Sequence, residues 1–215
     1  MGLFITFEGG EGCGKSTQAK ALWTELSRLG IPVELTHEPG GTSLGNELRR
    51  LLKTKSRRQD EISPEAELLL FAACRIQLTT EVILPNLRKG KIVICDRFAD
   101  STTSYQGYGR GVSLTTIKTI NELATQNIKP DLTILLDITA EKGLGRKQDS
   151  AEDRFETEEI AFHNKVRDGY LRLAAEEPER WLVVDATLPK AKISKIIWDN
   201  INQLLSQKQD MPKRG

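Results

Sequence analysis

The sequence lacks both an excess of charge of one sign and a long apolar run. Its 215 residues contain 31 Lys and Arg against 30 Asp and Glu, a formal net charge of +1. This balance argues against a general nucleic-acid-binding protein, whose basic excess normally shows in the sum. The longest unbroken apolar run, from Leu68 to Cys74, is far shorter than the ~18 residues that a membrane span needs. We therefore expect neither a nucleic-acid nor a membrane partner.

Cysteine is also scarce. Cys13, Cys74 and Cys95 are widely spaced and form no CxxC pair. An odd set with such spacing is typical of reduced, buried thiols in a cytosolic protein. The first residues contain no basic leader and no cleavage site. These features predict a cytoplasmic protein without a signal peptide.

Short apolar, β-branched runs recur along the chain. They are continuous rather than alternating, as is typical of strands buried on both faces, and they cover 4–7, 33–35, 92–95, 132–136 and 181–184. Helical periods separate them, which predicts an α/β fold of three layers, with a central parallel sheet of about five strands flanked by helices. Because we find no repeat or linker, we expect a single domain over 1–206 and a frayed tail over 207–215.

One long helix is predicted after the second strand. Ser63 is placed to be its N-cap, Pro64 its first residue, and Glu65 and Glu67 acids of its first turn. Apolar residues then continue towards Leu84, and we expect the helix to stop near the proline that follows.

The most specific motif follows the first predicted strand. It satisfies G-x-x-x-x-G-K-[ST] in the required strand–loop–helix context and consists of Gly9, Gly10, Glu11, Gly12, Cys13, Gly14, Lys15, Ser16 and Thr17. Glycines let successive N–H groups point at an anion, and the helix directs its N-terminal partial charge to the same point. Lys15 is expected to reach the β- and γ-phosphates of a nucleotide, and the Ser16 hydroxyl to ligate Mg²⁺. The motif makes the expected fold that of a P-loop NTPase.

Further candidates lie at the ends of later strands. The strand 92–95 ends in Asp96 and Arg97, an acid that could orient Mg²⁺ and a guanidinium that could clamp a phosphate. A purely structural Asp–Arg pair is the alternative. Asp137, at the end of the next strand, is a rival acid, but no basic residue follows it.

Two more features suit a second substrate. Phe71 and Arg75 are four residues apart and therefore share a helix face, where a ring could stack on a base and a guanidinium could bond its edge. The alternative is a core Phe with a snorkelling Arg. The charged stretch 146–154 could be a mobile lid whose cations neutralise charge, or an ordinary surface loop; the lid segment is expected near 142–158.

These features occur together in an order that resembles the bacterial thymidylate kinases, a family of nucleoside-monophosphate kinases. The resemblance covers nearly the whole chain and rests on the phosphate loop and on several further motifs: Phe7-Glu8-Gly9, Glu38-Pro39-Gly40-Gly41-Thr42, Phe71-Ala72-Ala73-Cys74-Arg75, Asp96-Arg97, Tyr105-Gln106-Gly107, Pro130-Asp131-Leu132-Thr133 and Asp153-Arg154-Phe155-Glu156. It implies transfer of the γ-phosphate of ATP to dTMP with Mg²⁺, in a homodimer packed through helices.

The resemblance also implies roles for single residues. Around the base and sugar it places Phe71, Arg75, Ser101, Thr102, Tyr105 and Gln106, with Tyr105 disfavouring a 2′-hydroxyl. Arg49 and Arg97 would hold the acceptor phosphate, beside a wall formed by Glu38 and Pro39. Glu11 would lie near the sugar or metal. The catalytic set would be Lys15, Arg97, Arg154 and Glu11, with Ser16 and Asp96 at the metal.

The chain departs from the family pattern in two places. The family often has Arg before Glu-Pro-Gly-Gly, whereas this chain has His37, so a phosphate contact there would need His37 or Arg50 to substitute. The lid segment contains only two arginines, Arg146 and Arg154, so Lys147 could share their work. His163 is expected to be structural.

Two other functions stay open from the sequence. One is a kinase for another nucleoside or nucleotide, because the pocket depth around a 5-methyl group cannot be read from residues. The other is a regulatory guanine-nucleotide switch, which needs an N-K-x-D motif. The nearest string, Asn164-Lys165-Val166-Arg167, ends in Arg and lies in a predicted helix.

Overall fold

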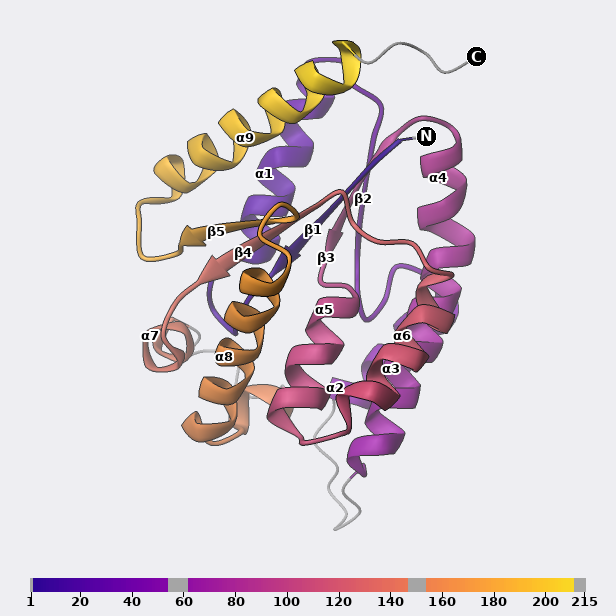
Figure 1. Ribbon diagram of the computed structural model, residues 1–215, viewed down its shortest axis with the longest axis vertical. Coiled ribbons are helices and arrows are strands. Elements are labelled where there is room, and N and C mark those ends of the chain that lie inside the picture. The colour runs from indigo at the N-terminus through magenta and orange to yellow at the C-terminus, as the bar shows by residue number, and fades with distance from the viewer. Residues whose placement is uncertain (1, 54–61, 147–153, 211–215) are drawn as a thin grey trace.

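The computed structural model describes residues 2–53, 62–146 and 154–210 and has a parallel sheet at its centre (Figure 1). In the part of the chain described, the sheet has the order β2-β3-β1-β4-β5. Its strands are β1 (Leu3–Glu8), β2 (Val33–His37), β3 (Ile92–Asp96), β4 (Leu132–Asp137) and β5 (Trp181–Asp185), all paired in parallel. The five apolar runs therefore predicted the strands correctly. Burial on both faces holds for β1, β3 and β4, whereas the edge strands β2 and β5 are only half-buried.

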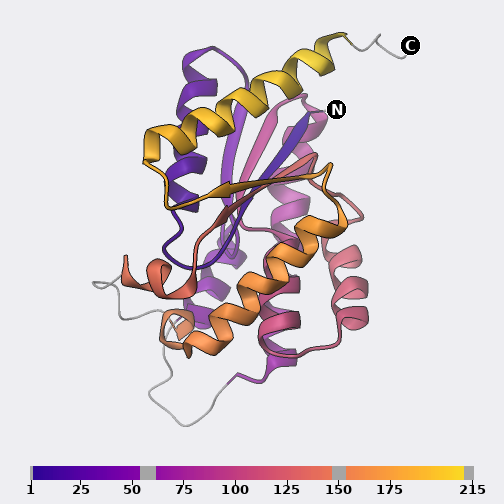
Figure 2. The same cartoon turned by 60° about the vertical axis from the view of Figure 1, so that its left-hand side comes forward.

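Helices cover both faces of this sheet, which confirms the predicted three layers (Figures 1 and 2). The helices are α1 (Lys15–Arg28), α2 (Ser43–Lys53), α3 (Pro64–Leu78), the π-helix η1 (Thr79–Ile83), α4 (Leu84–Arg88), α5 (Ala99–Thr102), the π-helix η2 (Thr103–Gly109), α6 (Leu114–Thr125), α7 (Ala140–Gly145), the 3₁₀-helix η3 (Arg154–Thr157), α8 (Ile160–Glu176) and α9 (Lys190–Asp210). Helix α9 passes the start of the predicted tail at 207, and 211–215 lie outside the described residues.

Successive side chains of β1 point to opposite faces of the sheet, so this strand contributes to the hydrophobic core on both faces. Leu3, Ile5 and Phe7 pack with apolar residues of α1 and α9 on one face. Phe4, between them, packs on the other face against residues of α3, η1 and α4. A third cluster joins η2 and α8 to β4 and β5 and contains Tyr105. Because every parallel strand ends at the same edge, the loops after β1, β2 and β3 lie together there.

The long helix begins as predicted but ends later. The Ser63 hydroxyl accepts a hydrogen bond from the backbone N–H of Ala66 (3.3 Å), so Ser63 is the N-cap. The predicted stop near Pro85 is wrong, because the helical chain continues to Arg88. Pro85 directly follows the wide π turn η1 and lies in the first turn of α4, a position where its missing N–H removes no helical bond.

By length and composition, this helix of 25 residues could cross a membrane. Core helices of soluble proteins pass the same criterion. In this structure α3 packs against α2 and α6, and 39% of the most apolar window of the long helix is buried. Part of the apolar surface of this helix is therefore left exposed by the rest of the described chain.

Candidate functional site

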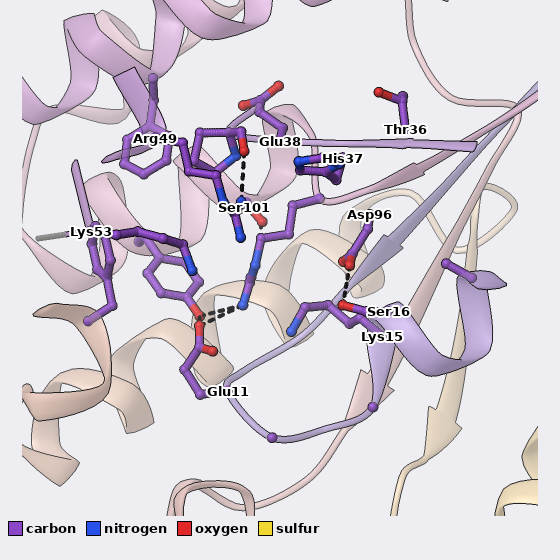
Figure 3. Close-up of a pocket in the computed structure, with 18 of the residues that line it drawn as sticks. Glu11, Lys15, Ser16, Thr36, His37, Glu38, Arg49, Lys53, Asp96 and Ser101 are labelled. Carbon is purple, nitrogen blue, oxygen red and sulfur yellow. Dashed lines mark hydrogen bonds and ion pairs between the residues drawn. The ribbon is translucent and has the colours of Figure 1, made fainter. Parts of the chain in front are cut away.

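A cavity of about 720 Å³ lies at the carboxyl ends of β1, β2 and β3 (Figure 3). At one end it is lined by the phosphate loop with Lys15 and Ser16, and at the other by Arg49 and Lys53 of α2. Residues of the β2 and β3 ends and of η2 complete the wall between them. One continuous cavity thus joins the predicted nucleotide loop to the predicted second site.

The phosphate loop has the backbone geometry that its glycines predict. Gly14 caps α1 with a φ of 96°, and Gly12 has a φ of 67°. A Cβ at Gly12 would lie 1.9 Å from the carbonyl oxygen of Gly143 in α7, so only glycine fits this close approach. Lys15 is buried, and its Nζ donates to the carbonyl oxygens of Gly9 (3.0 Å) and Gly10 (2.7 Å). Its ammonium group is therefore held at the mouth of the loop.

The two predicted metal ligands lie together. The Ser16 hydroxyl donates a hydrogen bond to Oδ2 of Asp96, as Figure 3 shows. A hydroxyl and a carboxylate oxygen beside a phosphate loop are the donors that Mg²⁺ takes in such sites, with water and phosphate oxygens completing its shell. The rival acid Asp137 is instead engaged by Arg167 of α8, at 2.7 and 2.8 Å. The described residues contain no cluster of three or more His, Cys, Asp or Glu that could form a separate metal site.

Arg97 connects this end of the cavity to its middle. Its backbone has a φ of 71°, in the left-handed region. Its guanidinium donates to Glu11 Oε1 (2.7 Å) and to the carbonyl oxygen of Gly9 (3.0 Å). The Tyr105 hydroxyl also donates to Glu11 Oε1 (2.8 Å), and the guanidinium lies over the Tyr105 ring at 5.0 Å. Three predicted site residues, from the phosphate loop, the position directly after β3 and η2, thus form one polar group.

Behind this group lies Glu8, a site residue that sequence reasoning quoted only as part of a motif. Its fully buried carboxylate accepts hydrogen bonds from the Ser101 hydroxyl (2.6 Å), the Phe98 N–H (2.8 Å) and the Tyr170 hydroxyl (3.0 Å). Burial, and secondly the charge of Asp100, raise the pKa of Glu8 to about 7. Tyr170 is 162 residues away in sequence, so no local signal could have found this pair.

Replacing Glu8 by Gln should remove a pH dependence of stability. Because the pKa of Glu8 is higher folded than unfolded, ionisation favours the unfolded chain, and stability falls as pH rises from 4.5 to about 7. The difference amounts to about 3 kcal/mol above that window. Urea unfolding of wild type and Glu8→Gln at several pH values should show the wild type losing stability relative to the variant across this window. Parallel curves would contradict the assignment.

Phe71 and Arg75 share a helix face as predicted, but they occupy different environments. Phe71 lines the cavity, whereas Arg75 is fully buried behind its wall and is not among the lining residues. The Arg75 guanidinium donates to both carboxylate oxygens of Glu38, to Asn121 Oδ1 (2.6 Å) and to the Thr102 hydroxyl (2.6 Å). It is therefore a buried, fully engaged cation rather than the snorkelling one of the alternative interpretation.

The remaining predicted substrate residues lie on the cavity. Its lining includes Glu38, Pro39, Arg49, Ser101, Thr102, Tyr105 and Gln106. Arg49 donates from Nη1 to the carbonyl oxygen of Pro39 (2.7 Å), and the peptide bond between Glu38 and Pro39 is cis. His37 also lines the cavity, but desolvation and the charge of Arg49 lower its pKa below the usual 6.5. A neutral imidazole at pH 7 does not replace the charge of the family arginine.

The described residues of the predicted lid segment lie in two environments. Arg154 donates to Glu67 of α3 and is not among the lining residues, so the structure does not bring it to the cavity. Arg146 does line the cavity, anchored by a hydrogen bond to the carbonyl oxygen of Ala186 (3.0 Å). Lys147 lies outside the described residues. The ring of Phe155 adds to the lining, next to Phe71 at 5.9 Å.

Comparison with known proteins agrees with this arrangement. A sequence model of the family described as thymidylate kinase matches residues 7–197. A thymidylate kinase of Dehalococcoides mccartyi strain 195 is 53% identical over 209 residues, covering 97% of this chain and 100% of the relative. One of Trichlorobacter lovleyi is 49% identical, covering 93% and 96%.

A solved structure supports the same grouping. The crystal structure of thymidylate kinase from Ehrlichia chaffeensis aligns with a TM-score of 0.74 and 35% identity, over 91% of this chain and 98% of that one. The P-loop fold, the cavity that it builds and these similarities lead to one conclusion: the chain belongs to the thymidylate kinase family and is a nucleoside-monophosphate kinase.

Proposed function

We propose that this enzyme transfers the γ-phosphoryl group of ATP to a phosphate oxygen of dTMP, giving ADP and dTDP. The observation that carries the proposal is the single cavity with a phosphate loop at one end and an aromatic, amide-bearing pocket at the other. The product dTDP is an intermediate of dTTP biosynthesis. The soluble family and the three buried free thiols support a cytoplasmic location.

In this proposal Lys15 holds the donor phosphates. Ser16 and Asp96 would hold Mg²⁺, which would offset the charge of the donor phosphates. Arg49, at the other end of the cavity, and Arg97, next to the phosphate loop, would hold the acceptor phosphate in line with the donor. Because both reactants are anions, alignment and charge neutralisation by these cations carry the catalysis, and no covalent nucleophile is needed.

The other assignments follow the lining of the cavity. Phe71 lines the cavity and would offer its ring to the base, and Tyr105 would disfavour a 2′-hydroxyl. Glu11 accepts hydrogen bonds from Arg97 and Tyr105 and would lie near the sugar or the metal. Arg146 is the lid cation that already faces the cavity. Arg154 would act on the transferring group only after leaving Glu67.

A coupled assay of purified protein with Mg·ATP tests the reaction. ADP release is expected to depend on dTMP and to be faster with dTMP than with dUMP, dCMP or dGMP. If another nucleotide of this panel reacts faster than dTMP, that nucleotide is the preferred acceptor and the assignment of dTMP is wrong. Absence of acceptor-stimulated ADP release would overturn the proposed reaction. The guanine-switch alternative gains no support, since Asn164 and Lys165 lie within α8.

We also propose that two copies associate through α3 and α6. These helices pack together and expose large apolar side chains: Leu69 (57%), Ile76 (38%), Leu114 (45%) and Leu123 (71%). Burying these side chains against a second copy removes them from water.

Charged substitutions on this face should dissociate the dimer. Leu69→Glu combined with Leu123→Glu is expected to shift sedimentation velocity from dimer to monomer, because two carboxylates would be buried unpaired in the interface. Leu29→Glu is the matched control, since Leu29 is 46% exposed at the end of α1. A wild-type monomer, or an equal effect of the control, would contradict the proposed interface.

A further inference from the structure

Glu67 lies in the first turn of α3 and is 1% exposed. It is not among the cavity-lining residues, yet it contacts one of them: its Oε1 accepts a hydrogen bond from Nε2 of Gln106 (2.7 Å). The same carboxylate accepts from Arg154 and, at 3.5 Å, from Nε of Arg110. Three donors from η2, the segment after it and the lid therefore converge on one buried acid.

These contacts fix which way the Gln106 amide is turned. A carboxylate beside two guanidinium groups only accepts hydrogen bonds, so the nitrogen of the amide must face Glu67. The amide oxygen is then left over, and no described residue donates a hydrogen bond to it. Gln106 is 1% exposed and lines the cavity near Phe71 and Tyr105. An acceptor without a donor at the cavity wall favours a ligand that brings one.

We propose that Glu67 is a positioning residue for base selection, which holds the nitrogen of the Gln106 amide and so presents its oxygen to the substrate. The inference rests on the proposed function and deepens it. Thymine and uracil carry an N–H donor at N3 and match this oxygen. Cytosine has an acceptor at N3 and would place two lone pairs against each other. Glu67 thus selects for pyrimidines with a protonated N3 without touching the substrate.

Glu67→Gln tests the inference, because an amide in place of the carboxylate can donate as well as accept. Both orientations of the Gln106 amide then become possible. The ratio of kcat/KM for dTMP over dCMP is expected to fall at least about tenfold, mainly through KM of the nucleoside monophosphates. The ratio of dTMP over dUMP should not change, since both bases carry the N3 donor. Loss of the contact between Glu67 and Arg154 should lower kcat/KM for all of these substrates by the same factor, and this factor cancels in the ratios.

Four further variants test the inference more closely. Glu158→Gln is the matched control, because Glu158 also accepts from Arg110 (2.6 Å) without contacting Gln106, and its dTMP/dCMP ratio should equal that of wild type. In a Gln106→Ala background, Glu67→Gln should not alter the ratio any further, as a double-mutant cycle requires. Glu67→Asp keeps the charge for the arginines with a shorter reach and should lower the ratio even if Glu67→Gln fails to fold.

The outcomes separate this inference from the proposed function. Wild-type protein that phosphorylates no dTMP overturns the proposed function. Wild-type activity combined with an unchanged dTMP/dCMP ratio in folded Glu67→Gln or Glu67→Asp overturns only the role of Glu67. A lower kcat with both ratios intact also overturns it, because that pattern marks a merely structural carboxylate.

Discussion

Lys15→Ala is expected to lower kcat about a thousandfold while the protein stays folded. The Lys15 ammonium lies at the mouth of the phosphate loop, on the carbonyl oxygens of Gly9 and Gly10. It must exchange these oxygens for the donor phosphates, whose charge rises as the bond to the leaving group breaks. Removing it therefore raises the barrier of the chemical step more than it weakens binding.

Steady-state kinetics with dTMP and Mg·ATP, beside a thermal unfolding curve, measure this effect. Lys195→Ala is the matched control, because Lys195 is an exposed lysine of α9 that pairs with Asp199. It should leave kcat unchanged. Normal turnover by folded Lys15→Ala would refute the role assigned to Lys15, whereas loss of the folded state would show that its bonds to the loop are structural.

Arg75→Met is expected to reduce the free energy of unfolding by about 3–5 kcal/mol. Arg75 and Glu38 form an ion pair in which both side chains are almost fully buried, 0% and 2% exposed. Without the guanidinium, Glu38 would be an uncompensated buried charge, and Asn121 and Thr102 would each lose a donor. Burial already raises the pKa of Glu38 although Arg75 opposes it.

The pH dependence of this loss has a definite sign. Removing Arg75 raises the pKa of Glu38 further in the folded state, so the deficit grows as pH rises above the unfolded pKa of 4.5. Urea unfolding at pH 5 and pH 8 should therefore show the larger loss at pH 8. The double variant Arg75→Met, Glu38→Gln should regain much of the stability. Arg28→Met, which removes an exposed pair with Glu25, is the control and should have a far smaller effect.

The same variant distinguishes two roles for Arg75. If Arg75 acts only by holding Glu38 and Thr102 in place, KM for dTMP should rise only as far as the displacement of these two residues accounts for. A larger rise in KM, retained in the double variant, would mean that Arg75 reaches the base directly when substrate is bound.

The sequence predicted much of this molecule wherever the signal was local. Continuous apolar runs located the strands, because a parallel strand covered on both faces has no polar side. The phosphate loop was recognised from its spacing alone, since the two fixed glycines of the motif, Gly9 and Gly14, have positive φ angles of 136° and 96° that favour glycine. Ser63 was recognised as a cap because it directly precedes Pro64.

What could not be predicted depends on pairs far apart in the chain. Glu11 and Arg97 meet across 86 residues, and Glu67 and Arg154 across 87. Helical spacing placed Arg75 on the face of Phe71 but could not tell that Glu38 would hold it inside the wall. The helix end was missed because Pro85 stops an ordinary α-helix, whereas a π turn before it places the ring at a new first turn.

The left-handed backbone at Arg97 limits which residues this position can accept. A residue with a side chain costs on the order of 1 kcal/mol in this conformation, which glycine adopts freely. Glycine at position 97 would relieve this cost, but it would also remove the guanidinium that pairs with Glu11 and donates to the carbonyl oxygen of Gly9. Because the loss of these bonds outweighs the relief of strain, glycine is expected to lower the stability of the protein although the backbone itself would accept it.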